Sequence, residues 1–315
     1  MLLQSRPVDR LIALFGDVRG LGADRRIAVC GTHRSGTTLL GDFLTADPRS
    51  RQIFEPFNPV FGIDGVTHSF VAGDAPDSRW HDVIDRFLAA DDVHFRRPPM
   101  EQPGISRWLK GTKAAREFVA ARLLRPRRLV FKCPFMTLSS NYLIDRHGIQ
   151  VVFTVKHPAA FFASLKRVGW HESLPLDDMV DQGVIDAATR DAATTAAARA
   201  GLFWAVVNGH ALDTHRRFPG ASTFWSHERF CRAPDDEMAR LTAALYIDYT
   251  PEMRSAVAAA THGVIVEPDG GTVHALVRDT AAMADSWRGR VSAEDEAELR
   301  ARCSALYEEI TGLHW

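Results

Sequence analysis

Short apolar runs recur along the chain, and each is followed by a stretch whose apolar positions have helical spacing. The strongest run, at 149–158, reads IQVVFTVKHP and is mostly β-branched or aromatic. Such a run is typical of a strand in a parallel sheet covered on both faces. Shorter runs lie at 27–30, 52–54, 128–134 and 221–228. Strands that alternate with helices predict an α/β fold, with a central parallel sheet flanked by helices.

The apolar spacing between these runs predicts the helices. They span 36–46, 80–90, 112–124, 138–147, 159–168, 186–217, 235–247, 251–260 and 292–311. The N-terminal stretch predicts a further short amphipathic helix that ends at Gly16 or Gly20. Outside its helices, the segment 58–127 is rich in Gly, Pro and Asp, as long binding loops often are. We therefore expect one domain over 1–315, with 58–127 as a substrate-binding insertion.

The composition narrows the class of protein only slightly. Apolar residues make up 46% of the 315 positions and charged residues 24%, which is ordinary for a soluble globular protein. A formal net charge of −1 argues against nucleic acid as a partner. The four cysteines match no zinc or disulfide spacing, so we expect reduced thiols, a cytoplasmic protein and no metal. No apolar stretch is long enough to span a membrane. The sequence leaves the oligomeric state open.

The most informative motif is IAVCGTHRSGTTLL at 27–40, in which a strand, a loop and a helix start follow one another. Glycines at Gly31 and Gly36 bound the loop and allow close approach of the backbone to a ligand. Backbone N–H groups at the following helix N-terminus favour an anion. Arg34 adds a guanidinium inside the loop, and further candidate ligand contacts come from its neighbours His33, Ser35, Thr37 and Thr38. The loop therefore predicts a phosphate-like ligand.

A nucleotide kinase is the main alternative, because its P-loop has the same strand, loop and helix order. That loop places a lysine after its second glycine, where this chain has Thr37. A kinase usually also has an acidic metal ligand at a strand end, and the strongest strand here ends in Lys156. A nucleotide-binding protein without turnover is a third possibility that the sequence leaves open.

A second candidate site lies on that strand and the helix after it. Lys156 ends the strand, and Ser164 follows eight residues later on the helix. The carboxyl ends of strands are where open α/β sheets bind ligands. A cation and a hydroxyl placed there could hold one phosphate group together.

The motifs THRSGTT and KHPAAFFASLKR together resemble the sulfotransferases that use 3′-phosphoadenosine 5′-phosphosulfate, abbreviated PAPS. The resemblance implies a three-layer P-loop-type α/β fold and transfer of a sulfuryl group. It implies that the first loop binds the 5′-phosphosulfate, and that Lys156 and Ser164 bind the 3′-phosphate. This chain has Lys156 where the family usually has arginine, and His157 where it has Asp or Asn.

Other family features extend the resemblance along the chain. Lys132 in VFKCP matches the lysine that the family places near the sulfuryl group, and Arg34 would share that role. Trp287 and Arg288 match a C-terminal cluster that closes over the nucleotide. The histidine that many members place two residues after the lysine is replaced by Pro134.

The acid in IFEPFNP offers another catalytic base. Glu55 resembles the acid in the FEP segment of carbohydrate-type sulfotransferases, where it is the suggested base. An alternative is that Glu55 only orders its loop, with the base supplied by a histidine of the insertion, namely His68, His81 or His94. We expect a small hydroxyl acceptor, such as a sugar, a glycolipid or a natural product, or less readily an amine.

Overall fold

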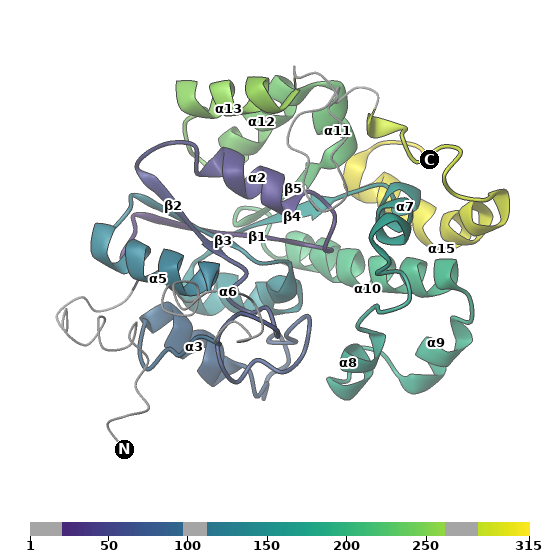
Figure 1. The fold of residues 1–315 in the computed structure, drawn as a ribbon, viewed down its shortest axis with the longest axis horizontal. Helices are drawn as coiled ribbons and strands as arrows, with labels where there is room; N and C mark the ends of the chain where they lie inside the picture. Colours follow the sequence, from purple (N-terminus) through teal and green to yellow (C-terminus); the bar gives the residue numbers. More distant parts are fainter. Residues whose placement is uncertain (1–20, 97–111, 262–282) are drawn as a thin grey trace, which may run out of the picture.

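The computed structural model describes residues 21–96, 112–261 and 283–315 (Figure 1). Its elements in chain order are β1 (Arg25–Gly31), α2 (Thr37–Leu44), β2 (Ser50–Phe54), α3 (His81–Ala89), α5 (Lys113–Leu124), β3 (Arg128–Lys132), the 3-10 helix η1 (Pro134–Ser139), α6 (Ser140–His147), β4 (Gln150–Val155), α7 (Pro158–Val168), α8 (Leu176–Asp181), α9 (Ala187–Ala192), α10 (Ala196–Arg217), β5 (Ser222–Ser226), α11 (His227–Arg232), α12 (Pro234–Ala244), α13 (Pro251–Thr261) and α15 (Ala293–Thr311). The expected N-terminal helix lies outside the described residues.

The five strands form one sheet in the order β2-β3-β1-β4-β5, and every neighbouring pair is parallel. This confirms the predicted α/β fold with a central parallel sheet. From β1 the chain goes first to the edge strand β2 and returns to β3, which lies between them. It then crosses to β4 and β5 on the other side of β1. The direction of strand order therefore changes between β1 and β4, and ligands bind beyond the carboxyl ends of strands at such a point.

Helices cover both faces of the sheet, so the strands alternate between two apolar cores. Ile27 and Val29 of β1 face the core under α2, α12 and α13. Ala28 and Cys30 face the other core, to which α3, α5 and α6 contribute. In Figure 1 these two groups of helices lie above and below the sheet. The continuous apolar runs of the sequence thus reflect burial on both faces.

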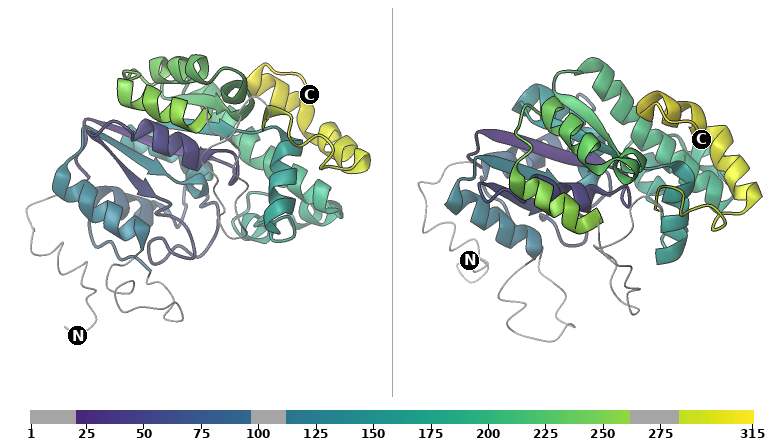
Figure 2. Two further views of the ribbon diagram at one scale, coloured as in Figure 1. Left: turned by 45° about the horizontal axis from the view of Figure 1, so that its top comes forward. Right: turned by 90° about the horizontal axis from the view of Figure 1, so that it is seen from above.

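The C-terminal helix extends the second face of the sheet. Helix α15 packs along α10 and α7, and a third core of large apolar side chains joins them. Figure 2 shows α15 at the end of the molecule opposite α5, beside α10 in both views. The structure thereby places the C-terminal helix α15 next to α7, the helix that carries Ser164.

One of the helices predicted from the sequence is wrong. The continuous helix expected over 186–217 is two helices, α9 and α10, with a break at 193–195. Thr195 has an extended backbone, and its side chain accepts a hydrogen bond from the N–H of Ala198. A threonine that bonds to the backbone in this way starts a new helix, although the alanines around it favour a continuous one. The sequence reading also missed the short helix α8.

Candidate active site

A cavity of about 480 Å³ lies beyond the carboxyl ends of β1 and β4. It is lined by His33, Arg34, Gly36, Thr37, Thr38, Leu39, Phe54, Glu55, Phe61, Lys132, Pro134, Lys156, Ser164, Arg167, Trp170, His227 and Met283. The volume lies in the usual range of small-molecule sites, about 300–1,000 Å³. The first loop, the Lys156 and Ser164 pair, Glu55 and Lys132 are far apart in the sequence. In the structure they all contribute to the wall of this one cavity.

The first loop needs both of its glycines. Gly31 and Gly36 have φ angles of 129° and 102°, which L side chains rarely adopt. A Cβ on Gly31 would lie 2.4 Å from the carbonyl oxygen of Thr154, and one on Gly36 would lie 2.8 Å from the Trp225 ring. The loop is therefore pressed against β4 and β5, and its path depends on the absence of side chains at these two positions.

The hydroxyl of Ser35 is used inside the loop. It donates a hydrogen bond to the carbonyl oxygen of Thr32 over 2.5 Å, and it lies 2.5 Å from Oγ1 of Thr154. Ser35 is fully buried and does not line the cavity. Its side chain holds the loop closed, so a ligand would meet the backbone here. Thr37 and Thr38 do line the cavity, at the N-terminus of α2, where the N-cap residue Gly36 has no side chain to bond the first N–H groups.

Three cationic side chains, those of Arg34, Lys156 and Arg167, line the cavity together with Ser164. Nε of Arg34 donates a hydrogen bond to Oγ of Ser164 over 3.3 Å. Burial lowers the pKa of Lys156, and the positive charges of Arg34 and Arg167 lower it further, whereas Glu228 opposes them. Like charges this close repel one another, so the cluster favours a bound anion with more than one negative charge. Arg167 was missed in the sequence, although its position one helical turn after Ser164 was a usable signal.

Glu55 and Lys132 form a nearly buried ion pair. Nζ of Lys132 bonds to Oε1 of Glu55, and the side chains are 3% and 14% exposed. Oε2 of Glu55 accepts a hydrogen bond from Nδ2 of Asn58 over 2.8 Å. The backbone N–H of Glu55 donates to the carbonyl oxygen of Lys132 over 2.7 Å, which ties the end of β2 to β3. The family resemblance implied separate roles for these two residues, and their pairing is visible only in the structure.

His33 contributes a neutral imidazole to the cavity wall. Burial lowers its pKa to about 4, with smaller contributions from the charges of Arg34 and Lys132. Its ring stacks on Phe203 with the centroids 5.0 Å apart. His227 also lines the cavity, and the sequence reading did not single it out, although it directly follows strand β5. Position at the carboxyl end of a strand was the signal that could have identified it.

Trp287 and Arg288 do not line the cavity. The Trp287 ring stacks on His157 with a centroid distance of 4.7 Å and is buried in the core beside α15. Nε of Arg288 donates to a carboxylate oxygen of Asp285 over 3.2 Å at the surface. His157 therefore occupies the space between the strand end and the C-terminal segment, and a nucleotide contact by Trp287 or Arg288 stays a prediction.

The insertion histidines also lie outside the cavity lining. His68 bonds to Thr67 and Arg79, His81 stacks on Tyr142, and His94 pairs with Asp92. Among the described residues, Glu55 is the one acid that lines the cavity. Of these candidate bases, Glu55 belongs to the described cavity lining and the three histidines do not.

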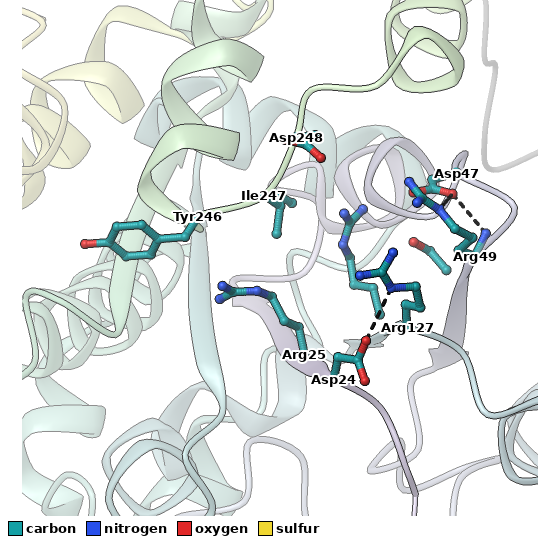
Figure 3. Close-up of a pocket in the computed structure, with 10 residues that line it drawn as sticks. Asp24, Arg25, Asp47, Arg49, Arg127, Tyr246, Ile247 and Asp248 are labelled. Carbon is teal, nitrogen blue, oxygen red and sulfur yellow. Dashed lines mark hydrogen bonds and ion pairs between the residues drawn. The ribbon is translucent and has the colours of Figure 1, made fainter.

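A second hollow lies at the opposite, amino-terminal edge of the sheet (Figure 3). It is also rich in arginine, but acids accompany the basic groups: Arg49 pairs with Asp47, and Arg127 pairs with Asp24. Internal ion pairs satisfy much of the charge there. The cavity beyond β1 and β4 has four basic side chains and one acid among its described lining residues, and thus carries excess positive charge.

Solved sulfotransferase domains are similar to this chain in fold. A sulfotransferase domain from the Synechococcus PCC 7002 olefin synthase shares 16% identity at a TM-score of 0.47, covering 89% of this chain and 94% of that one. A sulfotransferase domain from the curacin biosynthetic pathway shares 15% identity at a TM-score of 0.46, covering 89% and 97%. The sulfotransferase STF9 from Mycobacterium avium shares 15% at 0.44, covering 81% and 75%. No family model and no curated protein matches the sequence.

Over 21–96, 112–261 and 283–315, no helix is both long enough and apolar enough to cross a membrane. Within the same ranges, no group of three or more His, Cys, Asp or Glu side chains is placed to hold a metal ion.

Proposed function

We propose that the protein is a cytoplasmic sulfotransferase that transfers a sulfuryl group from PAPS to a hydroxyl of a small acceptor. The observation that carries this proposal is the convergence of the first loop, Lys132 and the Lys156 and Ser164 pair on one cavity with excess positive charge. PAPS carries two separated anionic groups, and the cavity offers two separate sets of donors. One set is the N-terminus of α2 with its threonines, and the other surrounds Ser164.

The cluster around Ser164 would bind the 3′-phosphate of PAPS. Lysine at position 156 supplies a charge but not the two-pronged hydrogen bonding of an arginine. Arg167 and Arg34 supply guanidinium groups beside it, and both are close enough to lower the pKa of Lys156. The cavity therefore compensates for the lysine at 156 with arginines from the next helical turn and from the first loop.

The 5′-phosphosulfate would lie at the first loop, between the N-terminus of α2 and Lys132. Backbone N–H groups there favour the negative charge that the leaving group develops as the sulfuryl group moves. PAPS supplies the activated sulfuryl group: a bond forms between sulfur and the acceptor oxygen, and the bond from sulfur to the phosphate oxygen breaks. Lys132 would stabilise the sulfuryl oxygens during this exchange, whereas Arg34, which bonds to Ser164, belongs to the set of donors for the 3′-phosphate.

The pairing of Glu55 and Lys132 links the proton transfer to this stabilisation. Glu55 would accept the acceptor's proton as its oxygen bonds to sulfur. A protonated Glu55 carries no charge, so its ion pair with Lys132 ends at that moment. The ammonium group of Lys132 is then free to stabilise the oxygen between sulfur and phosphorus, where negative charge develops as PAP leaves. Asn58 holds Glu55 in place through its other carboxylate oxygen.

Part of the segment 58–127 belongs to the acceptor side in this proposal. Phe61 lines the cavity and follows Glu55 on the same turn. Helix α5, in contrast, packs on β2 and places Phe118 in the core that also contains Ala28 and Cys30. This helix therefore contributes to the stability of the fold rather than to acceptor binding. The whole chain would then act as a single sulfotransferase domain, in which only part of this segment meets the acceptor.

Ligand-dependent melting separates this function from a nucleotide kinase. PAPS, or its desulfated product PAP, should raise the melting temperature, because a ligand that binds only the native state stabilises it. ATP with magnesium should raise it far less. Lys156→Ala and Ser164→Ala should each weaken PAP binding. A larger shift with magnesium ATP than with PAP would refute the proposed function. Transfer from labelled PAPS to an acceptor then separates an enzyme from a protein that only binds the nucleotide.

A further inference from the structure

The cavity wall beyond the charged groups is apolar. Its apolar side chains are Leu39, Phe54, Phe61, Pro134, Trp170 and Met283. Among the described residues that line the cavity there is no Asp, Asn, Gln or Tyr, and Glu55 already bonds to Lys132 and Asn58. A sugar carries several hydroxyls, and each one that leaves water needs a hydrogen-bond partner. This wall provides few such partners and offers much apolar surface instead.

The turn after β2 fixes an apolar side chain in the lining of the cavity that also contains Glu55. Asn58 donates to Glu55, and the backbone N–H of Val60 donates to Oδ1 of Asn58 over 2.9 Å. The N–H of Gly62 donates to the carbonyl oxygen of Asn58 over 2.8 Å. A Cβ on Gly62 would lie 2.2 Å from the carbonyl oxygen of Pro56, so the turn is tightly folded. Phe61 is held between these bonded positions and lines the cavity.

Trp170 adds a second large apolar side chain to the lining. It follows α7, and its backbone N–H donates to the carbonyl oxygen of Leu165 over 3.0 Å, which fixes the end of the helix. Its side chain is 43% exposed, which is unusual for a tryptophan. The guanidinium of Arg34 lies 5.9 Å from its ring centre. An aromatic ring that lines a cavity and remains this exposed offers apolar area to a ligand there.

We propose that the acceptor is an alcohol or phenol whose single reactive hydroxyl meets Glu55, and whose apolar body lies on Phe61 and Trp170. This inference rests on the proposed sulfotransferase function and narrows it. It departs from the sugar acceptor that the FEP segment implied, because the cavity wall beyond the charged groups provides apolar surface, and Lys132 and Asn58 already bond to Glu55.

Sulfation of alcohols of increasing length and of a sugar, measured with PAPS and the full chain, tests the proposed acceptor class. The kcat/KM for straight-chain alcohols from butanol to octanol should rise about threefold to fourfold for each methylene that is buried. Methyl glucoside should be at least about a hundredfold poorer than octanol, since its hydroxyls lose their water without gaining partners. A flat response to chain length, or a preference for the glucoside, would overturn the proposed acceptor class.

Substitutions at Phe61, in the turn after β2, and at Trp170, after α7, test whether these side chains cause the dependence on chain length. Phe61→Ala and Trp170→Ala should each reduce the gain per methylene and raise KM for octanol. The PAP-induced rise in melting temperature should be kept in Phe61→Ala, whereas Trp170→Ala also removes the ring beside Arg34. Val60→Ala is the control, because Val60 is in the same turn and 71% exposed but does not line the cavity. If Phe61→Ala loses its PAP response through misfolding, Phe61→Leu should show an intermediate gain per methylene.

The outcomes distinguish the two proposals. A wild-type chain that binds PAP and sulfates glucoside best would leave the function standing and reject the apolar acceptor. A chain-length response that Phe61→Ala and Trp170→Ala both leave unchanged would also reject it. A wild-type chain that does not respond to PAP would overturn the function and the acceptor together.

Discussion

Nε of Arg34 donates a hydrogen bond to Oγ of Ser164 over 3.3 Å, although 130 positions separate the two residues in the sequence. The bond joins the loop after β1 to the helix after β4, and these strands are neighbours in the sheet. The two motifs that suggest a bound nucleotide are therefore parts of one site. Arg34 adopts a φ of 67°, which is uncommon for a residue with a side chain, and this turn of the backbone accompanies the bond to Ser164.

Arg167 should discriminate nucleotides by their 3′-phosphate. Arg167→Ala should weaken PAP binding about tenfold to a hundredfold, the range for a lost charge-assisted hydrogen bond. Binding of 5′-AMP, which lacks the 3′-phosphate, should change by less than about threefold. Lys166→Ala is the matched control, because Lys166 is the adjacent cation on α7 and lies against Asp295 outside the cavity lining. Calorimetric titration checks this, and equal losses for both nucleotides would contradict it.

Glu55 should be needed for turnover but not for nucleotide binding. Glu55→Gln keeps the size of the side chain and removes its ability to take a proton, so kcat should fall about a hundredfold to ten-thousandfold. The dissociation constant for PAP should remain close to that of the wild type. Glu117→Gln is the control: Glu117 is an acid near β2 that bonds to the N–H of Phe54 and does not line the cavity. Steady-state rates with labelled PAPS measure the effect, and unchanged turnover in Glu55→Gln would exclude Glu55 as the base.

Gly36 should tolerate a side chain less well than another glycine with positive φ. Gly36→Ala adds backbone strain of about 1–2 kcal/mol, and the clash with Trp225 adds about 1–3 kcal/mol. Gly65→Ala separates the two effects, because Gly65 also has positive φ, but an added Cβ there would meet nothing within 4 Å. Urea unfolding should show the larger loss for Gly36→Ala. Similar losses in both variants would mean that the loop adjusts to the added carbon.

His33 should make the fold less stable in acid. Its pKa is lowered to about 4 in the folded state, against about 6.5 when unfolded, so the unfolded chain binds the proton first. The stability from this residue is present above pH 6.5 and is lost as the pH falls from 6.5 towards 4. The loss is on the order of 1–3 kcal/mol, because each unit of pKa difference corresponds to about 1.4 kcal/mol and the side chain is only partly buried.

Two variants isolate this pH dependence in urea unfolding between pH 4 and pH 7. His33→Phe keeps an aromatic ring against Phe203 and should lose less stability in acid than the wild type. His314→Gln should behave as the wild type does, because His314 is 94% exposed. Some loss should remain in His33→Phe, since burial also lowers the pKa of His157 to about 4. A wild-type slope in His33→Phe would assign the acid sensitivity to other groups.

The sequence alone was enough to determine the fold class and to single out nine of the seventeen described residues that line the cavity. Local patterns decide both: apolar runs mark strands that are buried on two faces, and a ligand loop must follow a strand directly. Arg34, Glu55, Lys132, Lys156 and Ser164 all follow or end a strand, or lie on the next helix, so their positions along the chain already implied a shared edge of the sheet.

Only the tertiary structure decided which of these side chains contact one another. The Glu55 and Lys132 pair depends on β2 and β3 being neighbours in register, with Phe54 opposite Lys132, and no local pattern specifies strand order. The inward turn of the Ser35 hydroxyl and the packing of Trp287 on His157 depend on neighbours more than 100 positions away. Side chains compete for such space only after the chain has folded, so packing, rather than residue type, determined which polar groups remained available to a ligand.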